Sequence, residues 1–161
     1  MIGFIEKMLG RSEPVFSEAS PRDATALAAL HGVAFRRGWS ESEFERLLTG
    51  KNVIAHRAMT GRTLAGFILS RLAAGEAEIL SIAVAPARRR RGLARRLLDL
   101  HLRRLAGLAI RAVFLEVEEN NKPARRLYDR RGFREVGRRP AYYSQDNERP
   151  TNALILRRDL A

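Results

Sequence analysis

One stretch decides the fold, and it reads Ile79-Leu80-Ser81-Ile82-Ala83-Val84-Ala85-Pro86-Ala87-Arg88-Arg89-Arg90-Arg91-Gly92-Leu93-Ala94. Its apolar first half predicts a strand that Pro86 closes, and Gly92 then opens a helix that runs to about Leu105. A buried strand at 111–117 follows, and then a helix that starts at Asn121 and ends near 131–132. This order of strand, glycine turn, helix, strand and helix predicts an α/β protein.

Shorter elements flank this stretch. Ser20 and Pro21 predict the start of a helix that ends near Gly38, and Ser40 with Glu43 forms a capping-box pattern that opens a second helix. The remaining pattern predicts strands at 15–19, 52–59, 63–72, 76–84, 133–136 and 153–156, and the three from 52 to 84 form an antiparallel meander. We expect the last two strands to be joined through Tyr142, Tyr143 and a polar loop that runs from 144 to 152.

Length and composition predict a single domain. The chain has 161 residues, of which 45% are hydrophobic and 30% charged, and no run approaches the roughly 18 apolar residues that a membrane span requires. We expect one domain over residues 14–161, preceded by an extension at 1–13. Glu6 and Lys7 interrupt the segment where a signal peptide would need an apolar core, so we expect a cytoplasmic location.

The chain is strongly basic and has no cysteine. Its net charge of +12 predicts attraction to polyanions such as nucleic acid, ribosomes or a phosphorylated cofactor. Among 30 basic residues only Lys7, Lys51 and Lys122 are lysine, so a biased composition with a solvated arginine surface is the alternative interpretation. The lack of cysteine excludes disulfides, thiolate metal sites and an acyl-cysteine intermediate.

The turn before Gly92 has the features of a pyrophosphate site. A helix start leaves amide donors without intrahelical acceptors, and the positive end of the helix dipole together with the surrounding arginines favours an anion. Gly92 permits close approach of a phosphate to the backbone, and Ala94 is small. The sequence has neither a Walker motif nor a full dinucleotide fingerprint, and basic residues beside a helix-start glycine can also be purely structural.

Glu116 is the candidate general base and Tyr128 the candidate proton donor. Period-two geometry places Glu116 on the strand face opposite Val113, Leu115 and Val117. An amine that acts as a nucleophile has to lose a proton. An α-amino group has a pKa of roughly 7.7 to 8.0, so a carboxylate is a suitable base for this step. Tyr128 lies twelve residues further on, in the next helix, where its hydroxyl could protonate a departing thiolate. A surface glutamate and a core tyrosine are the alternative interpretations of these two residues.

Taken together, these motifs resemble the GCN5-related N-acetyltransferase (GNAT) superfamily. The resemblance covers residues 14–158 and rests on Ile82-Ala83-Val84, Arg89-x-x-Gly92-x-Ala94, Leu115-Glu116-Val117, Asn121 and Leu127-Tyr128-x-x-x-Gly132-Phe133. Within it, Trp39-Ser40-Glu41 and Arg138-Arg139-x-x-Tyr142-Tyr143 resemble ribosomal-protein-alanine N-acetyltransferases of the RimI type. The pattern departs from the family at Ala94, where glycine is commoner.

The resemblance implies a fold, a donor and a set of residue roles. The implied fold is a mixed, mostly antiparallel sheet with helices on both faces, splayed between the strands that end at Val84 and Val117, where acetyl-CoA enters. The implied catalytic residues are Glu116 and Tyr128. The implied acetyl-CoA contacts are the backbone of Ile82, Ala83 and Val84, the turn Arg89, Arg90, Arg91, Gly92, Leu93, Ala94 and Arg95, and Asn121. Direct attack by an amine in a ternary complex fits the lack of cysteine.

The acceptor is read from other residues. Acidic residues gather at Glu116, Glu118 and Glu119, which favours a cationic substrate. Trp39, Glu118, Tyr142 and Tyr143 are the predicted acceptor contacts, with Phe35 as a further apolar wall. We expect a protein N-terminus, a ribosomal one first of all.

Two other functions stay open at this stage. They are acetylation of a lysine side chain or small amine, and a basic module that binds RNA or ribosomes without catalysis. We expect a monomer or weak dimer, no membrane partner and at most non-specific nucleic-acid binding. We expect no metal, because His31, His56 and His101 lack ligand spacing.

Overall fold

The computed structural model describes residues 13–143 and 151–160, with side chains described except at 141–143. Contacts divide the chain into two compact units, the first from residues 13–69 and 81–101 and the second from 70–80, 102–143 and 151–160. Division of the chain into one domain with an extension at 1–13 stays a prediction, and residues 1–12 lie outside the described range.

A seven-stranded sheet runs through the chain in the order β1-β2-β3-β4-β5-β7-β6. Its strands are β1 Val15–Glu18, β2 Val53–Thr60, β3 Thr63–Ala73, β4 Glu76–Val84, β5 Ala112–Glu118, β6 Arg134–Tyr143 and β7 Thr151–Asp159. The pairs β1–β2, β5–β7 and β6–β7 are antiparallel, whereas β4–β5 is parallel. A parallel pair needs a long crossover, which here contains α4 Leu93–Gly107. The predicted mixed, mostly antiparallel α/β sheet is confirmed.

The parallel pairing between β4 and β5 is short. Its register runs from Glu76↔Ala112 to Ile79↔Leu115, although β4 continues to Val84 and β5 to Glu118. Beyond Leu115, β5 keeps its pairing with β7 as far as Glu118↔Ala153. The cleft that the resemblance implies beyond this point stays a prediction.

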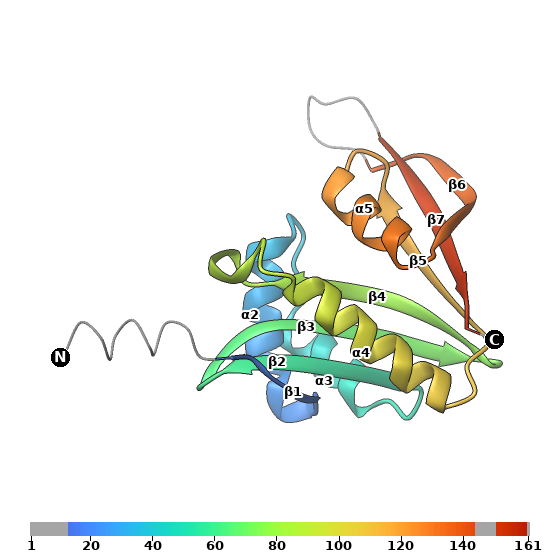
Figure 1. Ribbon diagram of the computed structural model, residues 1–161. Coiled ribbons are helices and arrows are strands. Elements are labelled where there is room, and N and C mark those ends of the chain that lie inside the picture. Colours follow the sequence, from blue (N-terminus) through green and yellow to red (C-terminus); the bar gives the residue numbers. More distant parts are fainter. Residues whose placement is uncertain (1–12, 144–150, 161) are drawn as a thin grey trace. The chain divides into compact units, whose positions relative to one another are not determined.

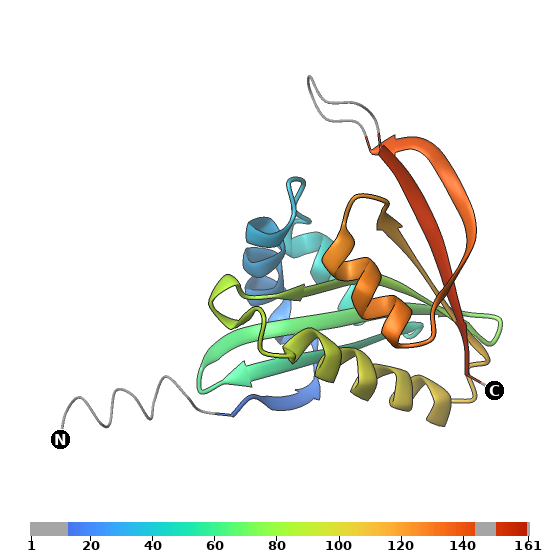
Figure 2. The same cartoon turned by 45° about the horizontal axis from the view of Figure 1, so that its top comes forward.

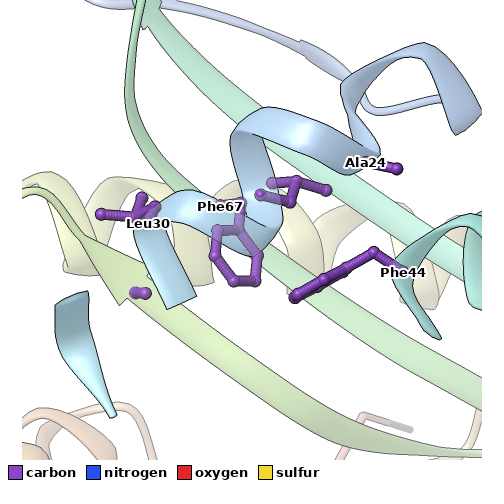
Figure 3. Packing of buried hydrophobic residues seen from close by; sticks show 6 residues of the cluster. Ala24, Leu30, Phe44 and Phe67 are labelled. Carbon is purple, nitrogen blue, oxygen red and sulfur yellow. The ribbon is translucent and has the colours of Figure 1, made fainter. Parts of the chain in front are cut away.

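In the first unit, helices cover both faces of the strands. Figure 1 shows α2 Ala24–Ala34 and α3 Glu41–Thr49 on one face of β2 and β3, with α4 on the other. Phe44 from α3 and Phe67 from β3 are both fully buried. Their rings make an edge-to-face contact, with ring centroids 5.6 Å apart. They form one core with Ala24, Leu27, Leu30 and Ala83 (Figure 3). Burial of such aromatic side chains supplies much of the stability of this layer.

Two helix starts in this unit follow their sequence signals. Ser40 Oγ accepts the Glu43 amide at 3.2 Å, and the Glu43 carboxylate accepts the Ser40 amide at 2.6 Å, so the predicted capping box is confirmed. Before α2, a 3₁₀ turn at Pro21–Asp23 begins after Ser20, whose amide donates to Asp23 at 2.8 Å. The helix α2 ends at Ala34 rather than near Gly38, because the chain becomes extended at Phe35.

The second unit contains the paired strands β5, β7 and β6 and the helix α5 Lys122–Arg130 (Figure 2). The strand pattern in β5 is confirmed, since Val113, Leu115 and Val117 are buried while Glu116 and Glu118 are partly exposed. The strand β6 extends to Tyr143, beyond the predicted end at residue 136, because its pairing with β7 resumes at Tyr143↔Thr151 after an irregularity. The loop predicted from 144 lies outside the described residues up to 150.

All three histidines are buried, and two of them contact each other inside the first unit. His56 on β2 and His101 on α4 place their Nδ1 atoms 2.8 Å apart, with exposures of 4% and 0%. One ring must donate and the other accept, so the contact requires at least one neutral imidazole. Burial, with a smaller effect from His56, lowers the pKa of His101 to about 3.

We expect this pair to destabilise the fold in acid. Between pH 6.5 and about 3 the unfolded chain binds a proton at residue 101 that the folded chain does not, so stability rises with pH across that window. Below about pH 6, each further drop of one pH unit should lower the free energy of unfolding by about 1.4 kcal/mol through this group. Urea unfolding at pH 7, 6, 5 and 4 should show a steeper fall for the wild type than for His101→Leu. Equal slopes would contradict the prediction.

Candidate functional site

The turn from β4 into α4 is built from two left-handed residues. Arg90 has φ +63° and Gly92 has φ +75°. The Gly92 carbonyl accepts the Arg96 amide at 3.1 Å, so Gly92 stands at the N-terminal cap and the next amides have no intrahelical acceptor. Alternation of conformation along such a turn aims successive backbone N–H groups into one concavity that suits an anion. This geometry fits a pyrophosphate.

The side chains of Arg89, Arg90, Arg91 and Arg95 are exposed, whereas Arg88 is half-buried and the adjoining Leu93 is buried. Arg89 donates through Nε to the Val84 carbonyl at 3.3 Å, and Arg88 donates to Thr60 Oγ1 at 3.1 Å. These bonds tie the turn to the end of β4 and to β2. Leu93 therefore anchors the helix start in the core, and its backbone amide is the part that can face a ligand.

The strand before the turn is closely packed. Ala83 is buried, whereas Ile82 and Val84 are partly exposed on the opposite face. A Cβ on Gly66 would lie 2.9 Å from the Ala83 carbonyl oxygen, so β3 and β4 approach too closely for any larger residue there. This packing fixes the backbone of residues 82–84, which the family resemblance assigns to acetyl-CoA.

We expect Gly92→Ala to weaken acetyl-CoA binding. The added Cβ has room, since its nearest neighbour is the flexible Arg95 side chain at 3.4 Å, but alanine at φ +75° is strained by about 1 kcal/mol. Relief of that strain would rotate the amides of the turn away from the phosphate. Calorimetry should give a dissociation constant raised about fivefold or more. Gly107→Ala, where a Cβ meets nothing within 4 Å, is the matched control.

Glu116 forms an ion pair that the sequence reasoning missed. Arg139 on β6 places a guanidinium nitrogen 3.1 Å from Glu116 Oε1, with side-chain exposures of 53% and 24%. The carboxylate is thus accessible from solvent and already holds a cation. An ammonium group that approaches Glu116 would take the place of this guanidinium.

The neighbouring glutamates also have partners. Thr151 donates to Glu118 at 2.9 Å, and Glu119 accepts from Asn152 at 2.9 Å and from Arg138 at 2.9 Å. The sequence reasoning counted these acids as negative charge that faces the substrate. Two arginines from β6 offset that charge, which weakens the argument for a strongly cationic acceptor. The signal was present in Arg138-Arg139, but only the sheet register reveals it.

Tyr128 and Asn121 lie on α5. Asn121 Oδ1 accepts the Ala124 amide at 3.3 Å and so caps the helix, as its sequence position predicts. This bond uses only the carbonyl oxygen, so the side-chain NH₂ group can still donate to a ligand. Tyr128 is 5% exposed, contacts the Phe133 ring edge-to-face at 5.6 Å, and has its pKa raised by burial to about 12. It is therefore a protonated phenol at neutral pH.

Of the predicted acceptor contacts, Trp39 is the one that lies in the first unit. Its ring stacks on His31 with centroids 4.6 Å apart and lies 5.4 Å from Phe44. Phe35 also stacks on His31, with ring centroids 4.3 Å apart, and is 40% exposed. The side chains of Tyr142 and Tyr143 lie outside the described ones, so their contact with an acceptor stays a prediction.

A groove in the second unit contains none of the predicted site residues. It has a volume of about 580 Å³ and lies between α5 and the strands β6 and β7. Phe133, Leu154 and Leu156 form its apolar floor, and basic residues of α5 line its rim. Among the residues that the structure describes, no group of three or more metal-binding side chains occurs, and no helix is long and apolar enough to cross a membrane.

Comparisons with known proteins agree on one family. Residues 24–133 match the family described as acetyltransferase (GNAT). An N-alpha-acetyltransferase RimI from Mycobacterium tuberculosis is 35% identical over 160 residues, which cover 94% of this chain and 97% of that protein. Two other curated relatives match over less of their length, 42% for a Mycobacterium leprae protein and 56% for a Haemophilus ducreyi enzyme.

Solved structures share the fold. The ribosomal-protein-S18-alanine N-acetyltransferase from Escherichia coli superposes with a TM-score of 0.87 at 27% identity, and the match covers 92% of this chain and 95% of that chain. The Arabidopsis thaliana NAA60 structure in complex with acetyl-CoA has a TM-score of 0.81 at 21% identity, with coverages of 91% and 98%.

Proposed function

Since this chain belongs to the acetyltransferase (GNAT) family, we propose that it transfers an acetyl group from acetyl-CoA to the N-terminal α-amine of a protein. The observation that carries the donor assignment is the turn at Arg90 and Gly92, whose left-handed residues aim helix-start amides at an anion. The relatives carry the acceptor assignment. The Mycobacterium tuberculosis protein is named an N-alpha-acetyltransferase, and the Escherichia coli structure is that of a ribosomal-protein-alanine enzyme.

The proposed reaction is a direct attack. The acceptor ammonium loses one proton to Glu116, and the resulting amine nitrogen forms a bond with the thioester carbonyl carbon. The carbon–sulfur bond then breaks, and coenzyme A leaves as a thiolate. The nitrogen loses its second proton, the thiolate takes up a proton through solvent, and Glu116 returns its proton to solvent. A backbone amide near Ile82 polarises the carbonyl and stabilises its developing negative charge. Tyr128 donates a hydrogen bond to the departing sulfur. No protein thioester takes part, because the chain has no cysteine.

Arg139 gives the base a resting partner. In the absence of an acceptor its guanidinium neutralises Glu116, and an arriving ammonium replaces it at the same carboxylate. The replacement keeps one positive charge beside the acid, so acceptor binding does not require a bare carboxylate. The Glu116 side chain is only 24% exposed. The α-amine of a protein N-terminus can still reach its carboxylate, because no residue precedes that amine in its chain.

The test is acetylation of a peptide panel. The panel should include ribosomal-protein N-termini, the same peptides with a blocked α-amine, internal lysine peptides and small polyamines, each incubated with acetyl-CoA and sequenced by mass spectrometry. We expect the label on the α-amine. Label confined to lysine side chains or small amines would instead show that the protein is a lysine or small-amine acetyltransferase. Salt-dependent RNA binding without acetyl-CoA binding would show that it is a non-catalytic RNA-binding module.

The proposed acceptor also sets the cellular context. Ribosomal proteins are made and assembled in the cytoplasm, so a cytoplasmic location follows from the proposal. The net charge of +12 would favour encounter with ribosomal RNA at low salt without any base-specific contact.

A further inference from the structure

His31 lies at the centre of the aromatic cluster that holds Trp39. The residue is 3% exposed, and its ring stacks on Phe35, with ring centroids 4.3 Å apart, and on Trp39, with centroids 4.6 Å apart. Phe44 approaches its edge at 5.5 Å. A polar ring in this position is costly unless it makes a hydrogen bond, and His31 makes one to the backbone of the segment it supports.

That hydrogen bond defines the tautomer. The Trp39 amide donates to His31 Nδ1 at 3.0 Å. A backbone N–H can only donate, so Nδ1 carries the lone pair and the ring proton sits on Nε2. Protonation of Nδ1 would remove the acceptor and release the Trp39 amide.

A second observation shows that residues 35–39 are docked on α2. A Cβ on Gly38 would lie 2.9 Å from Gly32 Cα and 3.4 Å from the Gly32 nitrogen. The segment therefore approaches the backbone of α2 so closely that position 38 has no room for a Cβ. His31 and Gly38 hold the same segment from adjacent points.

We propose that His31, in its neutral form, is a positioning residue that fixes Trp39 for acceptor binding. This inference rests on the proposed function, in which Trp39 contacts the acceptor. His31 touches neither reactant in this scheme. It acts through Trp39, by one hydrogen bond and two stacked rings.

The charged surroundings of His31 come from α3 and the docked segment. Burial lowers the pKa of His31, and Glu43 on α3 partly opposes that shift. The pKa of Glu43 is itself lowered, first by the hydrogen bond from the Ser40 amide and then by Arg46 on α3 and Arg37 in the docked segment. From β3 the neighbour is Phe67, which is uncharged. We therefore expect release of Trp39 in acid, at a pH below the ordinary histidine value of about 6.5.

Two substitutions separate the hydrogen bond from the ring. His31→Phe keeps a stacked ring and loses the acceptor, whereas His31→Asn keeps an acceptor oxygen close to the Nδ1 position and loses the ring. We expect His31→Phe to raise the KM for an N-terminal peptide about 3- to 10-fold, as loss of one hydrogen bond predicts. Turnover and the KM for acetyl-CoA should change less than twofold, and His31→Asn should recover part of the peptide KM.

Glycine substitutions give a matched pair on the same contact. Gly38→Ala should push the segment off α2 and raise the peptide KM as His31→Phe does. Gly32→Ala should leave it unchanged, because a Cβ there meets nothing within 4 Å. Equal behaviour of the two alanine variants would contradict docking at this point.

Fluorescence tests the inference without acetyl transfer. Trp39 is the only tryptophan of the chain, and a protonated imidazole stacked on an indole quenches its emission. Wild-type emission should titrate at a pH below about 6.5, and this transition should be missing in His31→Phe. The same titration in both proteins, or an unchanged peptide KM in His31→Phe, would overturn the inference. Failure of the proposed function would instead appear as a wild type that acetylates no α-amine.

Discussion

Glu116→Gln is expected to lower the rate of peptide acetylation by about 100-fold or more while acetyl-CoA affinity stays nearly unchanged. Glutamine keeps the shape of the side chain, and its carbonyl oxygen can still accept from the Arg139 guanidinium that lies 3.1 Å away in the wild type. The substitution therefore removes the proton acceptor more than the local geometry. Without the carboxylate as proton acceptor, only the fraction of amine that is already deprotonated in solution can react.

The pH profile separates this role from a structural one. Below the α-amine pKa of roughly 7.7 to 8.0, the rate of the Glu116→Gln variant should rise tenfold per pH unit, and the deficit against the wild type should shrink at higher pH. A pH profile parallel to that of the wild type would remove Glu116 as the base. Glu78→Gln is the matched control, because Glu78 also pairs with an arginine, Arg71 at 3.5 Å, on a strand of the same unit.

The sequence predicted β5 well because one rule governs it. Strict alternation put Val113, Leu115 and Val117 in the core and left Glu116 on the other face, and the burial of each residue confirms this. The capping signals at Ser40 and Asn121 were equally local, since each residue bonds an amide three positions ahead. Local periodicity and capping act within a few residues, so the printed order of amino acids contains them.

Arg139 could not be predicted as the partner of Glu116 by the same means. The strand β7 comes last in the chain yet lies between β5 and β6, so Glu118, Ala153 and Arg139 share one row of the sheet. Arg139 reaches Glu116 across β7, two strands away. Such a contact depends on strand order and register, which no window of sequence contains.

His31 was missed for a related reason. The sequence reasoning weighed it only as a metal ligand and set it aside, because the three histidines lack ligand spacing. Its actual partner is the backbone amide of Trp39, eight residues ahead, in a segment that turns back on α2. Gly38 was the available signal, since a glycine permits such a close approach of its backbone to Gly32 on α2.

The structure narrows what Tyr128 can do. With a pKa of about 12, its phenol lies about 3.5 units above a thiol of pKa about 8.5, so complete proton transfer to a thiolate would be uphill by about 5 kcal/mol. A hydrogen bond donated to the developing negative charge on sulfur has no such cost. We therefore propose that Tyr128 stabilises the leaving thiolate mainly as a hydrogen-bond donor, a refinement of the full proton donor that the resemblance implies.

On this basis Tyr128→Phe is expected to lower turnover by about 100-fold. The phenylalanine ring can keep the 5.6 Å edge-to-face contact with Phe133, so the free energy of unfolding should change by less than about 1 kcal/mol. Acetyl-CoA affinity should also stay near the wild-type value, because the interaction forms as the carbon–sulfur bond breaks. Single-turnover rates with and without the hydroxyl measure this effect directly. Wild-type rates in a stable Tyr128→Phe protein would assign the residue to the core alone, where its 5% exposure already gives it a packing role.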